Sequence, residues 1–276
     1  MHERTRRVRG VRRTALIAML LVAAAVPASA QRRRGYRQPI NVDVSNIDFK
    51  EFNVPYDGRF TFVRLRYTPD YMGRGGSGSF LRGVDFQWDH DYPRAERHLT
   101  RIVSELTAIH VNDEGHNILT LDDPDLLKYP AAYLAEAGRW TLTDAEADGM
   151  RDYLLKGGFV IFDDFATQAW FNFEDQMRRV LPDHQLIQLD ASHPIFHSFF
   201  EIETLDEYYH PYYYVPSIFY GIFEDNDPTK RMMVIVNYNN DIGESWEFNA
   251  QGFIPIDLTN KAYKLGINYI VYAMTH

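Results

Sequence analysis

Apolar and polar positions recur along the chain with two different periods, which predict strands and helices in turn. Residues 60–67 carry apolar side chains with arginines between them, which is typical of a strand. Residues 159–162 are a continuous apolar run, as expected of a central parallel strand that is covered on both faces. The same reasoning predicts further strands at residues 117–121, 131–135, 185–189 and 232–238.

Helical spacing of apolar residues appears between these strands. Pro93 opens an amphipathic helix, and Thr143 with Glu146 forms a capping box that starts a second helix, which ends at Gly157. Two further helices are predicted around residues 170–180 and 260–275. Strands that alternate with helices predict a doubly wound α/β sandwich built as one domain over residues 58–276.

The stretch GGFVIFDDF, residues 157–165, joins a helix end to the predicted central strand and places two aspartates at its carboxyl end. In an open α/β sheet, ligands and reacting groups collect at that end. Asp163 and Asp164 are therefore the candidate catalytic residues. Adjacent residues of a strand point to opposite faces, so we expect one of them to face the crevice and the other to cap a helix or pair with Arg139 or Arg151.

Four predicted loops leave the carboxyl ends of strands, after Tyr67, Ala135, Phe162 and Tyr238. They contain every tryptophan of the chain, namely Trp88, Trp140, Trp170 and Trp246. A ring of tryptophans over a crevice is a common surface for stacking sugars or other rings. The alternative is that these side chains roof the sheet and stabilise long loops.

The same loops carry many acidic residues. They are Asp85, Asp89, Asp91, Glu136, Asp163, Asp164, Asp241, Glu244 and Glu247. Two neighbouring carboxylates can act as acid and base, or can hold a hard cation such as Ca²⁺ or Mg²⁺. The predicted ligand-binding set is Trp88, Asp89, Asp91, Glu136, Trp140, Trp170, His193, Asp241, Trp246 and Glu247, with no metal ligand or cofactor assigned.

Three other motifs have a structural and a functional interpretation. His193 and His197 have the spacing of zinc ligands on a helix, but no third ligand is obvious and structural histidines are expected. The glycine-rich residues 73–79 do not open directly into a helix, which favours a mobile flap over a phosphate cradle. The tyrosine-rich residues 208–220 can either bind a peptide or glycan or pack on the sheet with wet hydroxyls.

The amino-terminal thirty residues predict export. A basic start, an apolar run over residues 15–26 and Ala28-Ser29-Ala30 are typical of a cleaved secretory signal, and the run is short for a membrane anchor. Loss of six arginines and Glu3 moves the formal net charge from −9 to −14, so nucleic acid is a poor partner. Residues 31–57 are then a basic and extended lead-in. The expected location is periplasmic or extracellular.

Several separated motifs resemble one bacterial family. They are YPAAYLAEAGRWTLTDAEADGMRDYLLKGGFVIFDDF, HPIFHSFF, DIGESWE and AYKLGINYIVYAMTH. Over residues 58–276 they are similar to the family catalogued as domain of unknown function 4159. That resemblance implies a flavodoxin-like three-layer sandwich with a mostly parallel sheet, similar to class I glutamine amidotransferases, and it implies no activity.

The chain differs from true amidotransferases because it contains no cysteine. Those enzymes use a cysteine nucleophile on a strand-to-helix turn, so glutaminase activity is not expected. The sequence favours a non-catalytic binding or scaffold module of the cell envelope, with an unidentified ligand or protein partner. The alternative is a hydrolase that acts on an envelope glycan or peptide through a carboxylate or hard-metal site. Convergent carboxylates in a crevice would favour the hydrolase.

Overall fold

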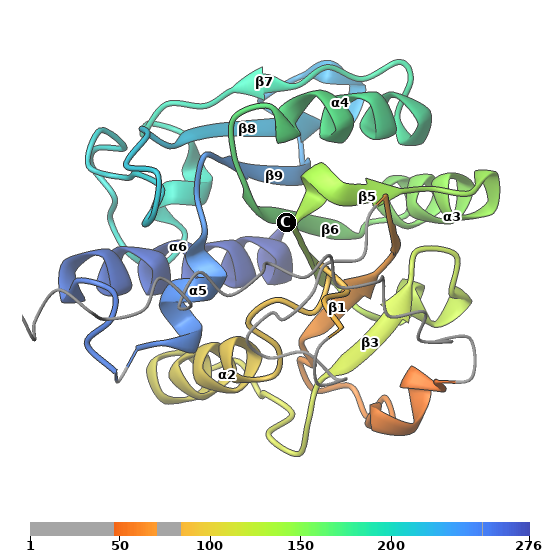
Figure 1. Cartoon of the computed structure of the whole chain (residues 1–276), viewed down its shortest axis with the longest axis horizontal. Coiled ribbons are helices and arrows are strands. Elements are labelled where there is room, and N and C mark those ends of the chain that lie inside the picture. Colours follow the sequence, from red (N-terminus) through yellow and green to blue (C-terminus); the bar gives the residue numbers. More distant parts are fainter. Residues whose placement is uncertain (1–46, 71–83, 250) are drawn as a thin grey trace, which may run out of the picture. The chain divides into compact units, whose positions relative to one another are not determined.

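The computed structural model describes residues 47–70, 84–249 and 251–276, all within one structural unit of residues 43–276 (Figure 1). The predicted signal segment, most of the basic lead-in and the glycine-rich residues 73–79 lie outside the described residues. No helix in the described ranges has the length and apolar character needed to cross a membrane.

A mostly parallel sheet of seven strands forms the centre of the fold, in the order β3-β1-β4-β6-β9-β8-β7. Its strands are β1 (Val63–Arg66), β3 (Asn117–Thr120), β4 (Ala131–Ala135), β6 (Phe159–Phe165), β7 (Ile187–Gln188), β8 (Ile218–Phe223) and β9 (Met232–Tyr238). The first five strands in this order pair in parallel with one another, and β8 and β7 extend the sheet in antiparallel pairing. If the five parallel strands are numbered 1 to 5 as they occur along the chain, their order across the sheet is 2-1-3-4-5, which is the flavodoxin-like arrangement.

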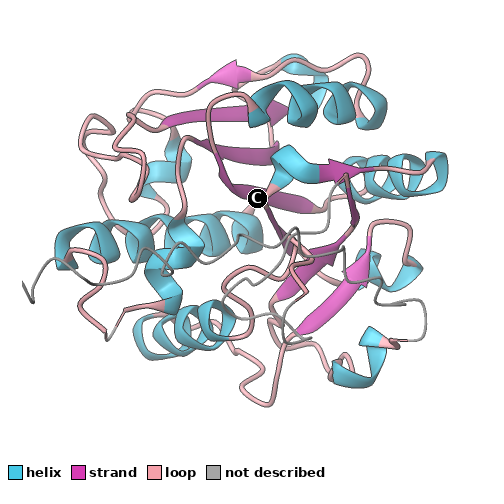
Figure 2. Ribbon diagram, in the orientation of Figure 1, coloured by secondary structure: helices cyan, strands magenta, loops and turns pink. Residues whose placement is uncertain are grey.

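Helices cover both faces of this sheet, so the fold has three layers (Figure 2). One face carries α2 (Arg94–Leu106), α5 (Ile242–Glu247) and α6 (Ile256–Thr275), which pack on one another. The other carries α3 (Asp144–Leu155) and α4 (Ala169–Val180). A two-stranded antiparallel ribbon of β2 (Thr68–Pro69) and β5 (Trp140–Thr141) lies beside the sheet.

Alternation along β6 explains how one strand serves two cores. Phe159 and Ile161 belong to the hydrophobic core beneath α6, whereas Phe162 packs against Trp140 and Phe173 on the other face. All seven residues of β6 are buried, which confirms the prediction of a strand covered on both faces.

Most of the predicted elements are confirmed, including the capping box of Thr143 and Glu146, in which each side chain accepts from the backbone of the other residue. The sequence prediction was incomplete at two places. β8 begins inside the proline-broken aromatic residues 208–220, and the six-residue α5 is too short to give a periodic signal. The central strand also extends to Phe165, so that Asp163 and Asp164 lie inside it.

The two edges of the sheet end differently. At the β3 edge, the side-chain amide of Asn53 donates to the carbonyl of Ile118 and accepts from its N–H, at 3.0 and 2.7 Å. The Asn117 side chain accepts from the N–H of Val54 and donates to its carbonyl in the same way. At the opposite edge, β7 has only two residues.

Candidate functional site

A pocket of about 690 Å³ lies where the carboxyl ends of β4, β6 and β9 meet the loop before α2. This is the switch point of the sheet, where the chain order reverses between β1 and β4. Its wall is mostly polar. The charged and aromatic residues that line it are Asp70, His90, Asp91, Glu136, Arg139, Asp164, Phe165, His210, Tyr212, Tyr213, Asp241 and Glu244.

The two consecutive aspartates of β6 have different roles. Asp163 is fully buried and accepts four hydrogen bonds, from the Tyr133 hydroxyl, the Asn237 amide and the N–H groups of Ile242 and Gly243. It thereby ties the start of α5 to the sheet. Asp164 lines the pocket instead.

A backbone irregularity separates these two carboxylates. The pairing of β6 with β9 shifts register between Phe162 and Phe165, and Asp164 has a left-handed φ of 57°. Glu136 and Asp91 also adopt positive φ, at 52° and 65°. Such a backbone costs of order 1 kcal/mol or more for a residue with a side chain, and it turns all three carboxylates toward the same space.

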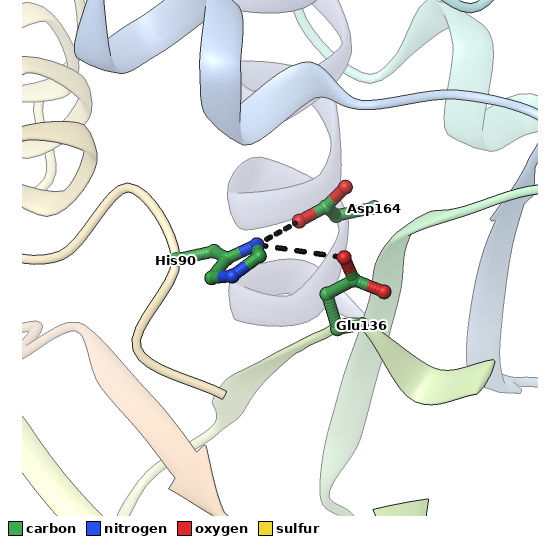
Figure 3. A group of neighbouring side chains, drawn as sticks. All are labelled: His90, Glu136 and Asp164. Atoms are coloured by element: carbon green, nitrogen blue, oxygen red, sulfur yellow. Dashed lines mark ion pairs between the residues drawn. The ribbon is translucent and has the colours of Figure 1, made fainter. Parts of the chain in front are cut away.

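His90 lies among three carboxylates, and Figure 3 shows two of them, Asp164 and Glu136. Its Nδ1 is 3.4 Å from Asp164 Oδ2 and 3.5 Å from Glu136 Oε1, and its Nε2 is 2.9 Å from Asp85 Oδ1. Burial by itself lowers the pKa of His90, but its hydrogen bonds to Asp164 and Asp85 and the charge of Glu136 outweigh burial and raise it to about 12. The surrounding acids therefore favour the protonated, positively charged form of His90.

A second group of carboxylates lies deeper. Asp91, Asp164 and Asp241 are all buried, and each offers an oxygen within 4.8 Å of the other two. Burial is the main cause that raises the pKa of each well above its ordinary value. The negative charges of neighbouring acids raise these pKa values further. No N–H or hydroxyl group among the described residues donates to Asp91 Oδ2, and the carboxyl of Glu244 lies beside the Asp91 side chain.

A buried ion pair holds the loop that carries His90 and Asp91. Arg64 in β1 has no exposed surface, and its Nε is 2.5 Å from Glu96 Oε1. Its Nη1 donates to the carbonyls of Trp88 and His90 at 3.1 and 2.8 Å. A planar guanidinium can make these bonds together, so Arg64 fixes the loop against the sheet.

Four of the predicted site residues form part of the pocket wall: Asp91, Glu136, Asp164 and Asp241. The tryptophans do not line it. Trp88, Trp140 and Trp246 are 0–1% exposed and belong to the core, and Trp170 packs against Tyr220 and Tyr238. Of the two interpretations of these loops, the burial of three tryptophans fits the roof over the sheet and not the aromatic platform over the crevice, because their large apolar surfaces are removed from water.

The other predicted residues lie away from the pocket wall. Asp89 is buried, and Glu247 is buried beside Arg94 with 2.6 Å between Oε1 and Nη2. His193 caps a short 3₁₀-helix, Pro194–His197, by accepting from the N–H of Ile195. His197 faces Glu201 at 2.5 Å. The two histidines therefore have separate partners.

Sequence reasoning missed the contribution of His90 and gave Glu244 no committed role. Both line the pocket, with Tyr212 and Tyr213 from the aromatic segment. The signal for His90 was its position between Asp85, Asp89 and Asp91, since a histidine among acids is readily held protonated.

Comparison with known proteins adds one finding. A family model described as Domain of unknown function (DUF4159) matches residues 61–274. The search of curated proteins found no match.

Proposed function

The chain belongs to the DUF4159 family, and from its pocket we propose that it is an exported hydrolase that cleaves a glycan or peptide through the carboxylates at the strand ends. The observation that carries this proposal is the convergence of Asp91, Glu136, Asp164 and Asp241 on one pocket. A scaffold needs no such arrangement, because buried acids that repel one another weaken the fold.

Hydrolysis needs one group that takes a proton from the attacking water and one that returns a proton to the leaving atom. Glu136 fits the first role by position, since its side chain is about a quarter exposed and borders the pocket. His90 holds Glu136 and Asp164 on either side of one nitrogen, which keeps both carboxylates in place without blocking the pocket.

The proposed substrate class rests on the pocket rim. Tyr212 and Tyr213 line the pocket, and Tyr213 remains 64% exposed. Exposed aromatic rings beside carboxylates are suited to stacking a sugar ring while its hydroxyls donate hydrogen bonds, and they suit an apolar peptide side chain equally well. The tyrosine segment thus takes the place of the tryptophans expected from the sequence.

Two finer parts of the proposal rest on sequence. The amidotransferase-like subclass of the flavodoxin-like fold is supported by the motif resemblance and the strand order, without the cysteine of those enzymes. Export is supported by residues 1–30 and is tested by cell fractionation with amino-terminal sequencing of the mature protein. A mature chain that begins at Gln31 is expected, whereas an uncleaved cytoplasmic chain would contradict export.

The hydrolase is tested with envelope polysaccharides and peptides, by measuring new reducing ends and new amino groups. Glu136→Gln is expected to lower turnover by about 100-fold or more, as is usual for loss of an acid–base group. Asp148→Asn, an exposed acid of α3, is the matched control and should retain full activity. Saturable binding of a substrate without turnover in any variant would instead establish the non-catalytic binding module.

A further inference from the structure

We propose that Asp91, Asp164 and Asp241 bind one hard divalent cation of the Mg²⁺ or Ca²⁺ class in this pocket. The use of that cation in catalysis rests on the proposed function, whereas its binding does not.

The spacing of the three carboxylates fits a single ion. Their oxygens lie within 4.8 Å of one another. Two ligands of one ion lie at most twice the metal–oxygen distance apart, which is about 5 Å for Ca²⁺ and about 4 Å for Mg²⁺. The three residues come from the loop before α2, from β6 and from the start of α5, so the folded sheet brings the ligands together.

Asp91 provides an independent indication of a ligand. Its side chain lines the pocket, yet the residue is only 2% exposed. No N–H or hydroxyl group among the described residues donates to its Oδ2, and its side-chain neighbour is another acid, Glu244. Buried carboxylate oxygens are almost always hydrogen-bonded, paired or coordinated to a metal. An ion in the pocket would satisfy this oxygen.

The cationic side chains near the pocket pair with acids other than Asp91 and Asp241. His90 is shared by Asp85, Glu136 and Asp164, and Arg64 is engaged by Glu96. Within the described ranges, neither Asp91 nor Asp241 forms an ion pair with a cationic side chain. A divalent cation supplies the positive charge that these buried carboxylates lack.

The donor set selects the kind of ion. All three donors are carboxylate oxygens, and Glu244 lies beside Asp91 as a further oxygen donor. Oxygen ligands suit Mg²⁺, Ca²⁺ and Mn²⁺, whereas zinc sites usually contain histidine or cysteine.

The test is isothermal titration calorimetry of the full chain, stripped with EDTA and titrated separately with Mg²⁺, Ca²⁺ and Mn²⁺. One-to-one binding is expected for at least one of them. Asp91→Asn and Asp164→Asn should each weaken that binding by at least about 100-fold, since even loss of an outer partner of a metal ligand costs 10–100-fold. Asp148→Asn should bind as the wild type does.

Thermal unfolding checks that the variants fold. Both positions have a positive φ, which asparagine adopts readily, so both variants are expected to fold. The inference is overturned if none of the three ions binds at millimolar concentration, or if folded variants bind with wild-type affinity. Binding without hydrolysis of any test substrate would overturn only the proposed hydrolase. Hydrolysis that survives EDTA, without measurable binding, would overturn only the cation.

Discussion

Asp163 and Asp164 are neighbours in β6, but the Asp163 carboxylate is enclosed by four hydrogen bonds whereas the Asp164 carboxylate faces the pocket beside His90. The first carboxylate is part of the structure that holds α5, and the second is available for a ligand. Identical substitutions at these two positions therefore separate stability from function.

Asp163→Asn is expected to lower the free energy of unfolding by about 2–4 kcal/mol, because an amide cannot accept from all four donors and leaves buried donors unsatisfied. Asp164→Asn should leave stability unchanged or raise it, since it removes a buried charge among like charges. Urea unfolding followed by circular dichroism measures both. Equal losses for the two variants would contradict the separate roles.

Breaking the buried pair of Arg64 and Glu96 should be costly. Glu96→Gln is expected to lower the free energy of unfolding by about 3–5 kcal/mol, because it leaves the guanidinium buried without its counter-charge. The double variant Arg64→Met with Glu96→Leu should recover much of this loss. It should still bind ligands poorly, since the loop carbonyls of Trp88 and His90 lose their donor. Full recovery of binding would refute a positioning role for Arg64.

Gly243 tests the pocket without a change of charge. A Cβ at this position would lie 2.4 Å from Asp91 Oδ2 and 2.6 Å from the Tyr133 hydroxyl. Gly243→Ala is therefore expected to displace Asp91, cost about 1–3 kcal/mol and weaken cation binding in calorimetry.

Gly115→Ala is the matched control for that glycine. Its added Cβ would meet only the side chain of Val54, outside the pocket. Any loss of stability it causes should leave cation binding intact. If both variants bind with wild-type affinity, Gly243 does not position Asp91.

His116 gives the fold a pH dependence that is separate from the pocket. Burial, helped by the charges of Arg64 and Arg97, lowers the pKa of His116 to about 4. The unfolded chain then binds a proton near pH 6.5 that the folded chain does not, so stability is lost as the pH falls from about 6.5 to 4, by at most about 1.4 kcal/mol per unit.

NMR titration of the His116 ring measures this pKa directly. His116→Gln keeps a polar partner for the Tyr92 hydroxyl, which lies 2.6 Å from His116 Nε2, and should flatten the pH dependence of unfolding over that interval. An unchanged slope in this variant would assign the effect to other groups.

The sequence predicted the parts of the fold that local forces determine. Continuous or periodic apolar runs located most strands and helices, and the hydroxyl and carboxylate of Thr143 and Glu146 marked a helix start because they contact only nearby backbone. The carboxyl ends of the strands were correctly identified as the place where acids gather, since parallel strands end at a common edge.

The remaining site depends on contacts between distant segments. His90 meets Glu136 and Asp164 only after β1, β4 and β6 align, and no local period encodes that meeting. The orientation of Trp246 was equally hidden, because it lies on α5, which was too short to predict, and packs on Tyr133 of the sheet. The positions of the tryptophans in the sequence predicted that they lie near the pocket. In the structure none of the four lines the pocket, and Trp88, Trp140 and Trp246 are buried in the core, as the hydrophobic effect favours.

The side chain of Asn53 protects one edge of the sheet against pairing with another copy of the protein. By bonding both backbone groups of Ile118, its amide acts as a substitute strand along β3, and the far edge at β7 is only two residues long. An unprotected edge is a template on which another chain can add a strand. These two devices reduce the free backbone at both edges of the sheet, so crowded copies have little surface for edge-to-edge aggregation.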